Sequence, residues 1–288
     1  MPSKTLVVGP TFLDIQVFLQ SLQTEDLKAS SSIGGKGFNV ARNLRTFGVD
    51  VDLATMYSAG EIGEYLESQI KQAGIGCFPE NKVKSEGGIF VGVHDSQGET
   101  IFDKADTKMF ATQTLVVDLS KYREVLVLSS TNTKVLDTLV AAKHEHNFKL
   151  CLELSGRKTV EHIQPYLPEF DFVIANRIET EALLETADIE TALNSFTKNN
   201  NKVFLTTLDK DGIIASQNGT SLTTPIHSLP TPLVSTVGAG DSVTAAFLVY
   251  YYRQNLSLPE ALAKCMRVAA HMVRQAEPYL IEVPKEVE

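Results

Sequence analysis

The stretch Ser235-Thr236-Val237-Gly238-Ala239-Gly240-Asp241 decides how this 288-residue chain is interpreted. The apolar pair Leu233-Val234 before it is typical of the end of a strand. Apolar residues at helical spacing follow it, at positions 243, 246, 247, 250 and 251. We therefore expect the glycines in a turn between a strand and the N-terminus of a long buried helix. The first N–H groups of such a helix lack partners and its dipole is positive there, so an anion can lie close to Gly238 and Gly240.

Asp241 adds a carboxylate to this anion-binding turn. A carboxylate repels a phosphate, but it can remove a proton from a hydroxyl group that lies next to one. The alternative is a tight turn in which Asp241 only caps the helix, a role that Asp often has. Short glycine motifs occur in many unrelated turns, so this stretch alone leaves both interpretations open.

A second glycine-rich turn, Gly34-Gly35-Lys36-Gly37-Phe38-Asn39, lies far upstream. It opens a helix, because apolar residues at helical spacing follow it at Val40, Leu44 and Phe47. The glycines expose the backbone around the Lys36 ammonium, and Asn39 can both donate and accept hydrogen bonds. This set suits a polyhydroxylated or anionic small molecule. Its spacing differs from the GxxxxGK[ST] pattern of a nucleotide-binding phosphate loop.

Composition and charge narrow the class of protein. With 43% hydrophobic residues the chain can bury one large core, and its net charge of −9 argues against a nucleic-acid or membrane-surface partner. The apolar run at 6–9 is too short for a signal peptide or a membrane span. The cysteines are odd in number and scattered along the chain, at Cys77, Cys151 and Cys265, so disulfide bonds are not expected. This predicts a reducing, cytoplasmic location.

The order of apolar runs predicts an α/β fold, a three-layer α/β/α sandwich around a mostly parallel sheet. We expect strands at 6–9, 51–56, 125–128, 150–154, 171–175, 203–207 and 213–216. Helices are expected at 40–47, 62–73, 135–144, from 176 onward, and at 259–275. Residues 88–93 and 99–102 alternate around the turn-forming Asp95-Ser96-Gln97-Gly98, as in a hairpin. We interpret the chain as a single domain, 1–288, with a small β lid formed from about 12–32 and 82–112.

Polar residues follow several of these strands, where open α/β sheets bind their ligands. Asp14 follows the first strand, although a lone Asp there is more often a turn residue. Asn176 and Glu179 lie just past the carboxyl end of another strand and share one face of a first helical turn. Hard oxygen ligands beside a triphosphate suit Mg²⁺ held largely through water. The alternative for this pair is an ordinary helix start with an acidic first turn.

Together these motifs resemble the ribokinase/PfkB family of sugar and nucleoside kinases. Residues 34–41 are similar to the family's GGKGxNxA motif, and residues 236–241 to its TxGAGD motif. The pair Asn176 and Glu179 resembles its NxxE motif, and residues 207–212 resemble the TLGxxG turn on the ATP side. The β insert resembles the family's lid, and the resemblance covers essentially the whole chain.

The resemblance implies a role for each matching residue. Asp241 would be the general base on the acceptor hydroxyl, and Gly238, Ala239 and Gly240 would form the anion hole for the transferred phosphoryl group. Asn176 and Glu179 would organise Mg²⁺ and its waters. The remaining site residues would bind ATP (Asn176, Thr207, Asp209, Gly212, Thr236 and His271) or the acceptor (Asp14, Gly35, Lys36, Asn39 and Glu153).

The implied activity is an ATP-dependent transfer of the γ-phosphate to a primary hydroxyl of a small sugar or nucleoside. Within the family, the short C-terminus, Ser235 and residues 98–110 are similar to pseudouridine kinases, with ribokinase-like sugar kinases as the competing interpretation. The alternative function is a catalytically silent sugar- or nucleotide-sensing regulatory protein. It is suggested by two departures on the nucleotide side, Asp209 in place of a glycine and the atypical His271.

Two further expectations concern ions and partners. Ser235 stands where many family members have an Asp tied to a monovalent-cation site, which argues against K⁺ activation. The expected partners are a small-molecule sugar or nucleoside and ATP, with no nucleic acid and no membrane. The exposed edge of a β lid predicts a homodimer through the lid.

Overall fold

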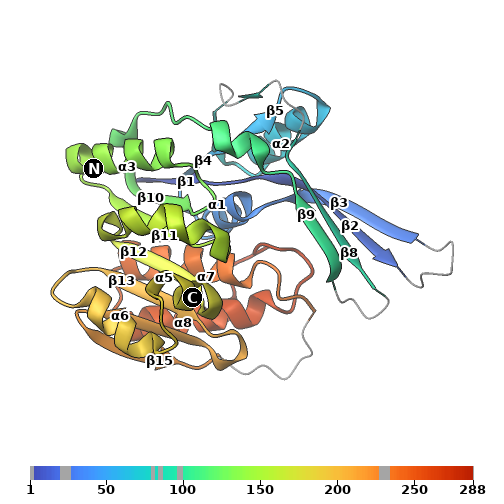
Figure 1. Ribbon diagram of the computed structural model, residues 1–288. Coiled ribbons are helices and arrows are strands. Elements are labelled where there is room, and N and C mark those ends of the chain that lie inside the picture. The colour runs from blue at the N-terminus through green and yellow to red at the C-terminus, as the bar shows by residue number, and fades with distance from the viewer. Residues whose placement is uncertain are drawn as a thin grey trace.

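A large, mostly parallel sheet forms the centre of the computed structural model, which describes residues 3–19, 27–78, 82–83, 87–95, 100–226 and 234–287 (Figure 1). The sheet has nine strands in the order β15-β14-β13-β12-β11-β10-β1-β4-β6. Neighbouring strands pair in parallel except at one edge, where β14 is antiparallel to β13 and β15 is antiparallel to β14. The strands are β1 (Lys4–Val8), β4 (Val51–Ala54), β6 (Gly76–Cys77), β10 (Tyr122–Leu128), β11 (Lys149–Glu153), β12 (Phe172–Asn176), β13 (Val203–Thr207), β14 (Ile213–Gln217) and β15 (Thr220–Thr224).

Helices cover both faces of this sheet, and alternate residues of each strand enter two separate cores. Leu126 and Phe172 point into the core under α1 (Lys36–Thr46), α2 (Glu61–Gln72), α7 (Ala239–Phe247) and α8 (Leu258–Met272). Val127 and Val173 point into the core under α3 (Thr133–His146), α4 (Val160–Ile163), α5 (Arg177–Leu184) and α6 (Ile189–Thr197). The three-layer α/β/α prediction is therefore confirmed.

Short helical segments connect several of these elements. The chain leaves α7 through a π-helical segment, η7 (Leu248–Arg253). The 3-10 segments are η2 (Lys108–Thr112), η3 (Leu119–Lys121), η4 (Arg157–Thr159), η5 (Gln164–Glu169), η6 (Asp209–Asp211) and η8 (Lys285–Val287).

A second, four-stranded sheet in the order β3-β2-β8-β9 projects from one side of the body (Figure 1). Its strands are β2 (Phe12–Leu19), β3 (Leu27–Gly34), β8 (Ile89–His94) and β9 (Thr100–Ala105). The predicted hairpin is confirmed, since β8 and β9 are antiparallel neighbours. A separate pair of parallel strands, β5 (Tyr57–Ser58) and β7 (Lys82–Val83), forms a third, two-stranded sheet. Residues 20–26, 79–81, 84–86 and 96–99 of the predicted lid and its connections lie outside the described residues.

One local prediction is wrong, the strand expected before the downstream glycine turn. Leu233 lies outside the described residues, and Val234 belongs to no strand. Instead, the backbone N–H groups of Val234 and Ser235 donate to the carbonyl of Val273, at 2.8 and 3.3 Å. The chain therefore reaches the turn along the end of α8, because β14 and β15 already close that edge of the sheet.

The stacked pair Phe172 and Phe247 fastens α7 to the sheet, with ring centroids 4.7 Å apart and Phe172 fully buried. We expect Phe172→Ala to lower the free energy of unfolding by about 3–5 kcal/mol, since it removes the stack and leaves a cavity. Urea unfolding followed by circular dichroism measures this. Val116→Ala is the control, because Val116 is 72% exposed and its truncation should change stability by less than about 0.5 kcal/mol. Equal losses in the two variants would contradict the assignment of Phe172 to the core.

Candidate functional site

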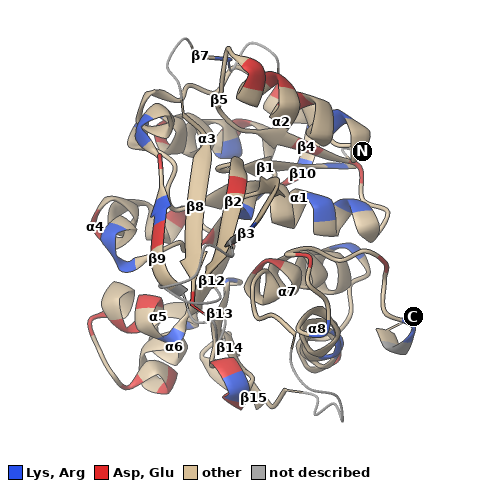
Figure 2. Ribbon diagram, turned by 90° about the vertical axis from the view of Figure 1, so that its right-hand side faces the viewer, with Lys and Arg blue, Asp and Glu red and all other residues tan. Residues whose placement is uncertain are grey.

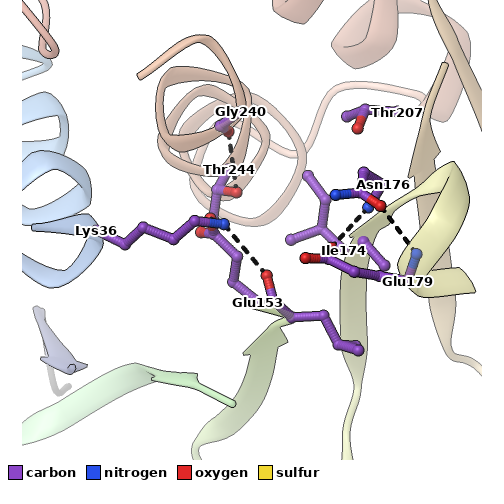
Figure 3. Close-up of a pocket in the computed structure, with 10 residues that line it drawn as sticks. Lys36, Glu153, Ile174, Asn176, Glu179, Thr207, Gly240 and Thr244 are labelled. Atoms are coloured by element: carbon purple, nitrogen blue, oxygen red, sulfur yellow. Dashed lines mark hydrogen bonds and ion pairs between the residues drawn. The ribbon is translucent and has the colours of Figure 1, made fainter. Parts of the chain in front are cut away.

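A cavity of about 190 Å³ lies at the carboxyl ends of β11, β12 and β13 (Figure 3). This is where an open parallel sheet binds ligands. Its lining combines residues from both glycine motifs with residues from the strand ends: Lys36, Glu153, Leu154, Ile174, Ala175, Asn176, Glu179, Thr207, Gly240 and Thr244. The structure thus brings together Lys36, Glu153, Asn176, Glu179, Thr207 and Gly240 among the residues that the sequence predicts.

Lys36 is the first residue of α1, and its side chain reaches across to the end of β11 (Figure 3). Its Nζ lies 3.5 Å from Glu153 Oε1 and donates to the carbonyl of Leu154 at 3.3 Å. Burial pushes the pKa of Lys36 down, but the carboxylates of Glu153, Asp241 and Glu179 raise it above its usual value. Lys36 is therefore a permanent cation in this site.

Asp241 is the third residue of α7 and is almost fully buried. Its Oδ2 accepts a hydrogen bond from Asn39 Nδ2 at 2.8 Å, which joins the two glycine motifs directly. The residue that caps α7 is Gly238, so the alternative in which Asp241 is the helix cap is wrong. Burial raises the pKa of Asp241, while Lys36 and the hydrogen bond from Asn39 oppose that rise.

Glu153 ends β11 with only 4% of its surface exposed. Its Oε2 is buried and has no hydrogen-bond partner, although its Oε1 faces Lys36. Burial raises the pKa of Glu153 to about 8, against the lowering effect of Lys36 and with a contribution from Asp241.

Gly238 and Gly240 meet the backbone demands of the turn in different ways. Gly238 has φ of 80°, and a Cβ there would lie 1.9 Å from the carbonyl oxygen of Pro278, so only glycine fits. At Gly240 a Cβ would meet no atom within 4 Å, which leaves the backbone open toward the cavity. The N–H of Ala239 bonds to the carbonyl of Thr236 at 3.3 Å. The later N–H groups of this first turn, with the positive end of the helix dipole, suit an anion.

Asn176 and Glu179 form a reciprocal cap at the start of α5. Asn176 Oδ1 accepts from the N–H of Glu179 at 2.9 Å, and Glu179 Oε2 accepts from the N–H of Asn176 at 3.0 Å. Glu179 Oε1 also accepts from the N–H of Gly156 at 2.7 Å. The helix-start interpretation of this pair is thus correct. It leaves room for a second role, because both side chains still border the cavity.

This donor set fits Mg²⁺ only through water. In the described part of the chain, no group of three or more His, Cys, Asp and Glu side chains gathers in a way that would hold a metal ion. Mg²⁺ in phosphotransfer sites usually keeps several waters and takes one or two carboxylates together with substrate phosphates. Glu179, whose oxygens already accept backbone N–H groups, suits such water-mediated binding.

The remaining residues predicted for the nucleotide lie outside the cavity lining. Asp209 has φ of 51°, so it keeps the left-handed conformation that favours glycine. Gly212 has φ of 96°, and a Cβ there would lie 2.2 Å from the carbonyl oxygen of Thr224. Thr236 is exposed in the turn before α7, and His271 lies in the last turn of α8.

Asp14, Gly35 and Asn39 are also absent from the lining of the cavity. The carboxylate of Asp14 rests on Gly34, where a Cβ would be 2.1 Å from Asp14 Oδ2. Asp14 Oδ1 is buried without a hydrogen-bond partner, and burial raises the pKa of Asp14 to about 7. Thr244 also lines the cavity and was not predicted; its Oγ1 donates to the carbonyl of Gly240 at 3.2 Å. Its position one helical turn after Gly240 is the signal that could have identified it.

A comparison with known proteins decides the family, because the model of the pfkB family carbohydrate kinases matches residues 4–285. The chain belongs to the pfkB family. One relative of this pfkB-family kinase is the guanosine-inosine kinase of Exiguobacterium acetylicum, 26% identical, with 97% of each chain covered. Another is a tagatose-6-phosphate kinase of Staphylococcus epidermidis, 25% identical over 84% of this chain and 82% of the relative.

Solved structures share the fold. A carbohydrate kinase from Agrobacterium tumefaciens superposes with a TM-score of 0.83 at 19% identity, covering 99% of this chain and 95% of its own. The Arabidopsis thaliana ribokinase complexed with ribose and ATP has a TM-score of 0.83 at 20% identity, covering 96% and 94%. A Cryptococcus neoformans ribokinase in complex with ADP has a TM-score of 0.78 at 20% identity, covering 99% and 97%. At these identities the likeness shows the fold alone.

Membership of the family makes the chain a phosphotransferase with an alcohol group as acceptor, in a family of ATP-using kinases. The regulatory alternative gains no support from the comparisons. In the described part of the chain, no helix is both long and apolar enough to cross a membrane.

The raised pKa of Glu153 predicts a pH dependence of stability. In the unfolded chain this carboxyl group ionises near its ordinary pKa of 4.5, and in the folded protein near about 8. Between these values the folded state holds a proton that the unfolded state has lost, so the free energy of unfolding falls as the pH rises. Glu153→Gln should reduce that fall, as measured by urea unfolding at pH 5, 6.5 and 8. Glu64→Gln, at an exposed position of α2, should leave it unchanged; the same result for Glu153→Gln would refute the assignment.

Proposed function

We propose that this pfkB-family kinase transfers the γ-phosphate of ATP to a primary hydroxyl of a small sugar or nucleoside, with Asp241 as the general base. The buried hydrogen bond between Asn39 and Asp241 carries this proposal. It holds a carboxylate of raised pKa at the first turn of α7, beside backbone N–H groups that suit an anion. A base and an anion hole side by side are what phosphoryl transfer to a hydroxyl requires.

Each part of the site has a separate role in the proposed phosphoryl transfer. Asn39 orients the Asp241 carboxylate, which takes the proton of the acceptor hydroxyl as the new O–P bond forms, the bond between the γ-phosphate and the bridging oxygen breaks, and ADP leaves. The backbone of Gly238, Ala239 and Gly240 surrounds the transferred phosphoryl group, with Gly240 facing the cavity. Lys36, held by Glu153, adds a fixed positive charge.

The acceptor is bound between the upstream glycine turn and the second sheet. Glu153 and Asp14 each have a buried oxygen without a partner, which a sugar hydroxyl can satisfy. Gly35, Lys36 and Asn39 lie at the start of α1 beside them. The second sheet acts as the β lid, excluding water that would otherwise hydrolyse ATP.

ATP lies on the other side of the anion hole, near Asn176, Thr207, Asp209, Gly212, Thr236 and His271. Mg²⁺, when bound, would neutralise phosphate charge, and Asn176 and Glu179 would hold it through water. No activation by K⁺ is expected, because Ser235 brings no charge and its Oγ accepts the N–H of Val237 at 3.2 Å. A cytoplasmic location accords with the odd number and scattered positions of the three cysteines.

The first test is ADP release from Mg-ATP with a panel of acceptors, with and without K⁺. The panel contains ribose, fructose, 2-keto-3-deoxygluconate, adenosine, guanosine, inosine, uridine, pseudouridine and tagatose 6-phosphate. Asp241→Asn should lower kcat for the preferred acceptor by several orders of magnitude with unchanged nucleotide affinity and melting temperature, since it removes the proton acceptor and keeps the shape. A near-normal kcat in this variant would refute the base assignment. Asp137→Asn, the same chemical change at an exposed position of α3, is the control and should keep a normal kcat.

We also propose that the β lid pairs with its counterpart in a second copy of the chain. Ile15, Val17, Val91, Val93 and Phe102 fall on one face of this sheet by register. Phe102 is 53% exposed, which is unusual for so large an apolar residue next to other apolar side chains. Two such faces are self-complementary, as a two-fold dimer requires.

Sedimentation velocity at micromolar concentration tests the dimer. The unaltered chain should sediment as a dimer, and Phe102→Asp should convert it to a monomer by placing a charge in the apolar interface. Val116→Asp, at a 72% exposed position outside this sheet, should remain dimeric. An unaltered chain that stays monomeric, or a Phe102→Asp variant that stays dimeric, would count against the interface.

A further inference from the structure

The two faces of the second sheet look toward different parts of the molecule. Leu13 and Ser31 share one face and lie with Ile62 and Tyr65 of α2 around a separate hollow of about 280 Å³. Because side chains alternate along a strand, Asp14 and its neighbours point the opposite way. Figures 1 and 2 show α2 on one side of the sheet and α7 on the other. The Asp14 side, here called the acceptor face, therefore looks toward the proposed phosphotransfer site.

Register assigns the members of the acceptor face. Asp14 pairs with Ser32 on β3 and with Phe90 on β8, and Gly92 pairs with Asp103 on β9. The face thus presents carboxylates, hydroxyls and an aromatic ring, with Gln16 held by the His94 ring at 2.8 Å. Lys104 falls on the opposite face by the same register.

Lys and Arg are nearly absent from the acceptor face. Among its described residues the single such cation is Lys28, which pairs with Phe18 near the far end of β2. Figure 2 shows acidic residues on β2 and β9. A phosphate group on the acceptor would therefore meet carboxylates here and no guanidinium or ammonium group to pair with.

The lining of the cavity at the strand ends, here called the cavity floor, is also rich in carboxyl groups and poor in cations. Lys36 is the one cation among the described residues that line the cavity, and three carboxyl groups surround it: Glu153, Asp241 and Glu179. Its positive charge is already matched, so it offers little net attraction to a second anion. The unpartnered oxygens of Glu153 and Asp14 both need hydrogen-bond donors, which hydroxyl groups supply and a phosphate dianion does not.

We propose that the acceptor of this kinase carries no phosphate or other anionic group, and is an uncharged sugar or nucleoside. This inference rests on the proposed function, because it concerns the acceptor side of the same site. The acceptor face and the cavity floor reject an anionic acceptor by like-charge repulsion and by leaving buried acceptors unsatisfied. They accept a neutral ring whose hydroxyls donate to Asp14 and Glu153.

Matched pairs of acceptors, both members with a free primary hydroxyl, test this directly. Suitable pairs are inosine with inosine 3′-phosphate and tagatose with tagatose 6-phosphate, each assayed as kcat/KM by ADP release. The neutral member of the pair that is used should exceed its phosphorylated partner by at least about 100-fold. A phosphorylated member used as well as its neutral partner, or better, overturns this inference alone. No turnover with either pair or with the wider panel overturns the kinase proposal, and this inference with it.

A charge-reversal variant tests whether the acceptor face sets the preference for an uncharged acceptor. Asp103→Lys should raise kcat/KM for the phosphorylated member relative to the neutral one by about 10-fold, because it adds the missing cation. Glu64→Lys makes the same charge change at an exposed position of α2, across the sheet, and should leave the ratio unchanged. Equal shifts in the two variants would mean that overall charge sets the preference, which overturns the role of this face.

Discussion

The buried hydrogen bond between Asn39 and Asp241 is the contact on which the site depends. Each partner lies in the first turns of a helix that begins at a glycine, Gly35 for α1 and Gly238 for α7. Both glycines have a positive φ, 92° at Gly35 and 80° at Gly238, which residues with a side chain rarely adopt. Glycine at these two positions therefore determines where each helix begins. Once α1 and α7 are joined, Lys36 and Gly240 line the same cavity, so residues of both glycine motifs border one space.

Burial without full hydrogen bonding gives this site its chemistry. Asp14, Glu153 and Asp241 all have raised pKa values because the surrounding apolar layers remove them from water. The ammonium of Lys36 lowers the pKa of Glu153 and Asp241, and these two carboxyl groups together with Glu179 raise the pKa of Lys36. Groups whose pKa values are shifted by burial and by a neighbouring charge are frequent at catalytic sites, where a proton is transferred near neutral pH.

Local patterns in the sequence predicted the fold well. The helix and strand periods identify the parallel sheet, and the turn chemistry of residues 95–98 identifies the β8–β9 hairpin. The polar strand β15, Thr220–Thr224, was not predicted, because its pairing with β14 replaces any strong alternation of its own. The strand predicted at Val234 is absent, because the N–H of Val234 donates to the carbonyl of Val273 at the end of α8 and not to a neighbouring strand.

The candidate site was predictable as a set of residues and not as an arrangement. Spacing alone placed Asn176 and Glu179 together, but it could not show that each caps the other's backbone. Nor could it show that Asn39 orients Asp241 or that Glu153 is left with an unpartnered oxygen, since these depend on packing between distant segments.

That separation in sequence has a consequence for synthesis of the protein. Asn39 and Asp241 are 202 residues apart, and β1 must wait for β10 before it is paired on both sides. Domains generally fold as units as the chain leaves the ribosome. A nascent chain therefore exposes α1 with Lys36 and Asn39 long before α7 with Asp241 exists, so the cavity between the two glycine motifs is completed only after the last helices have emerged.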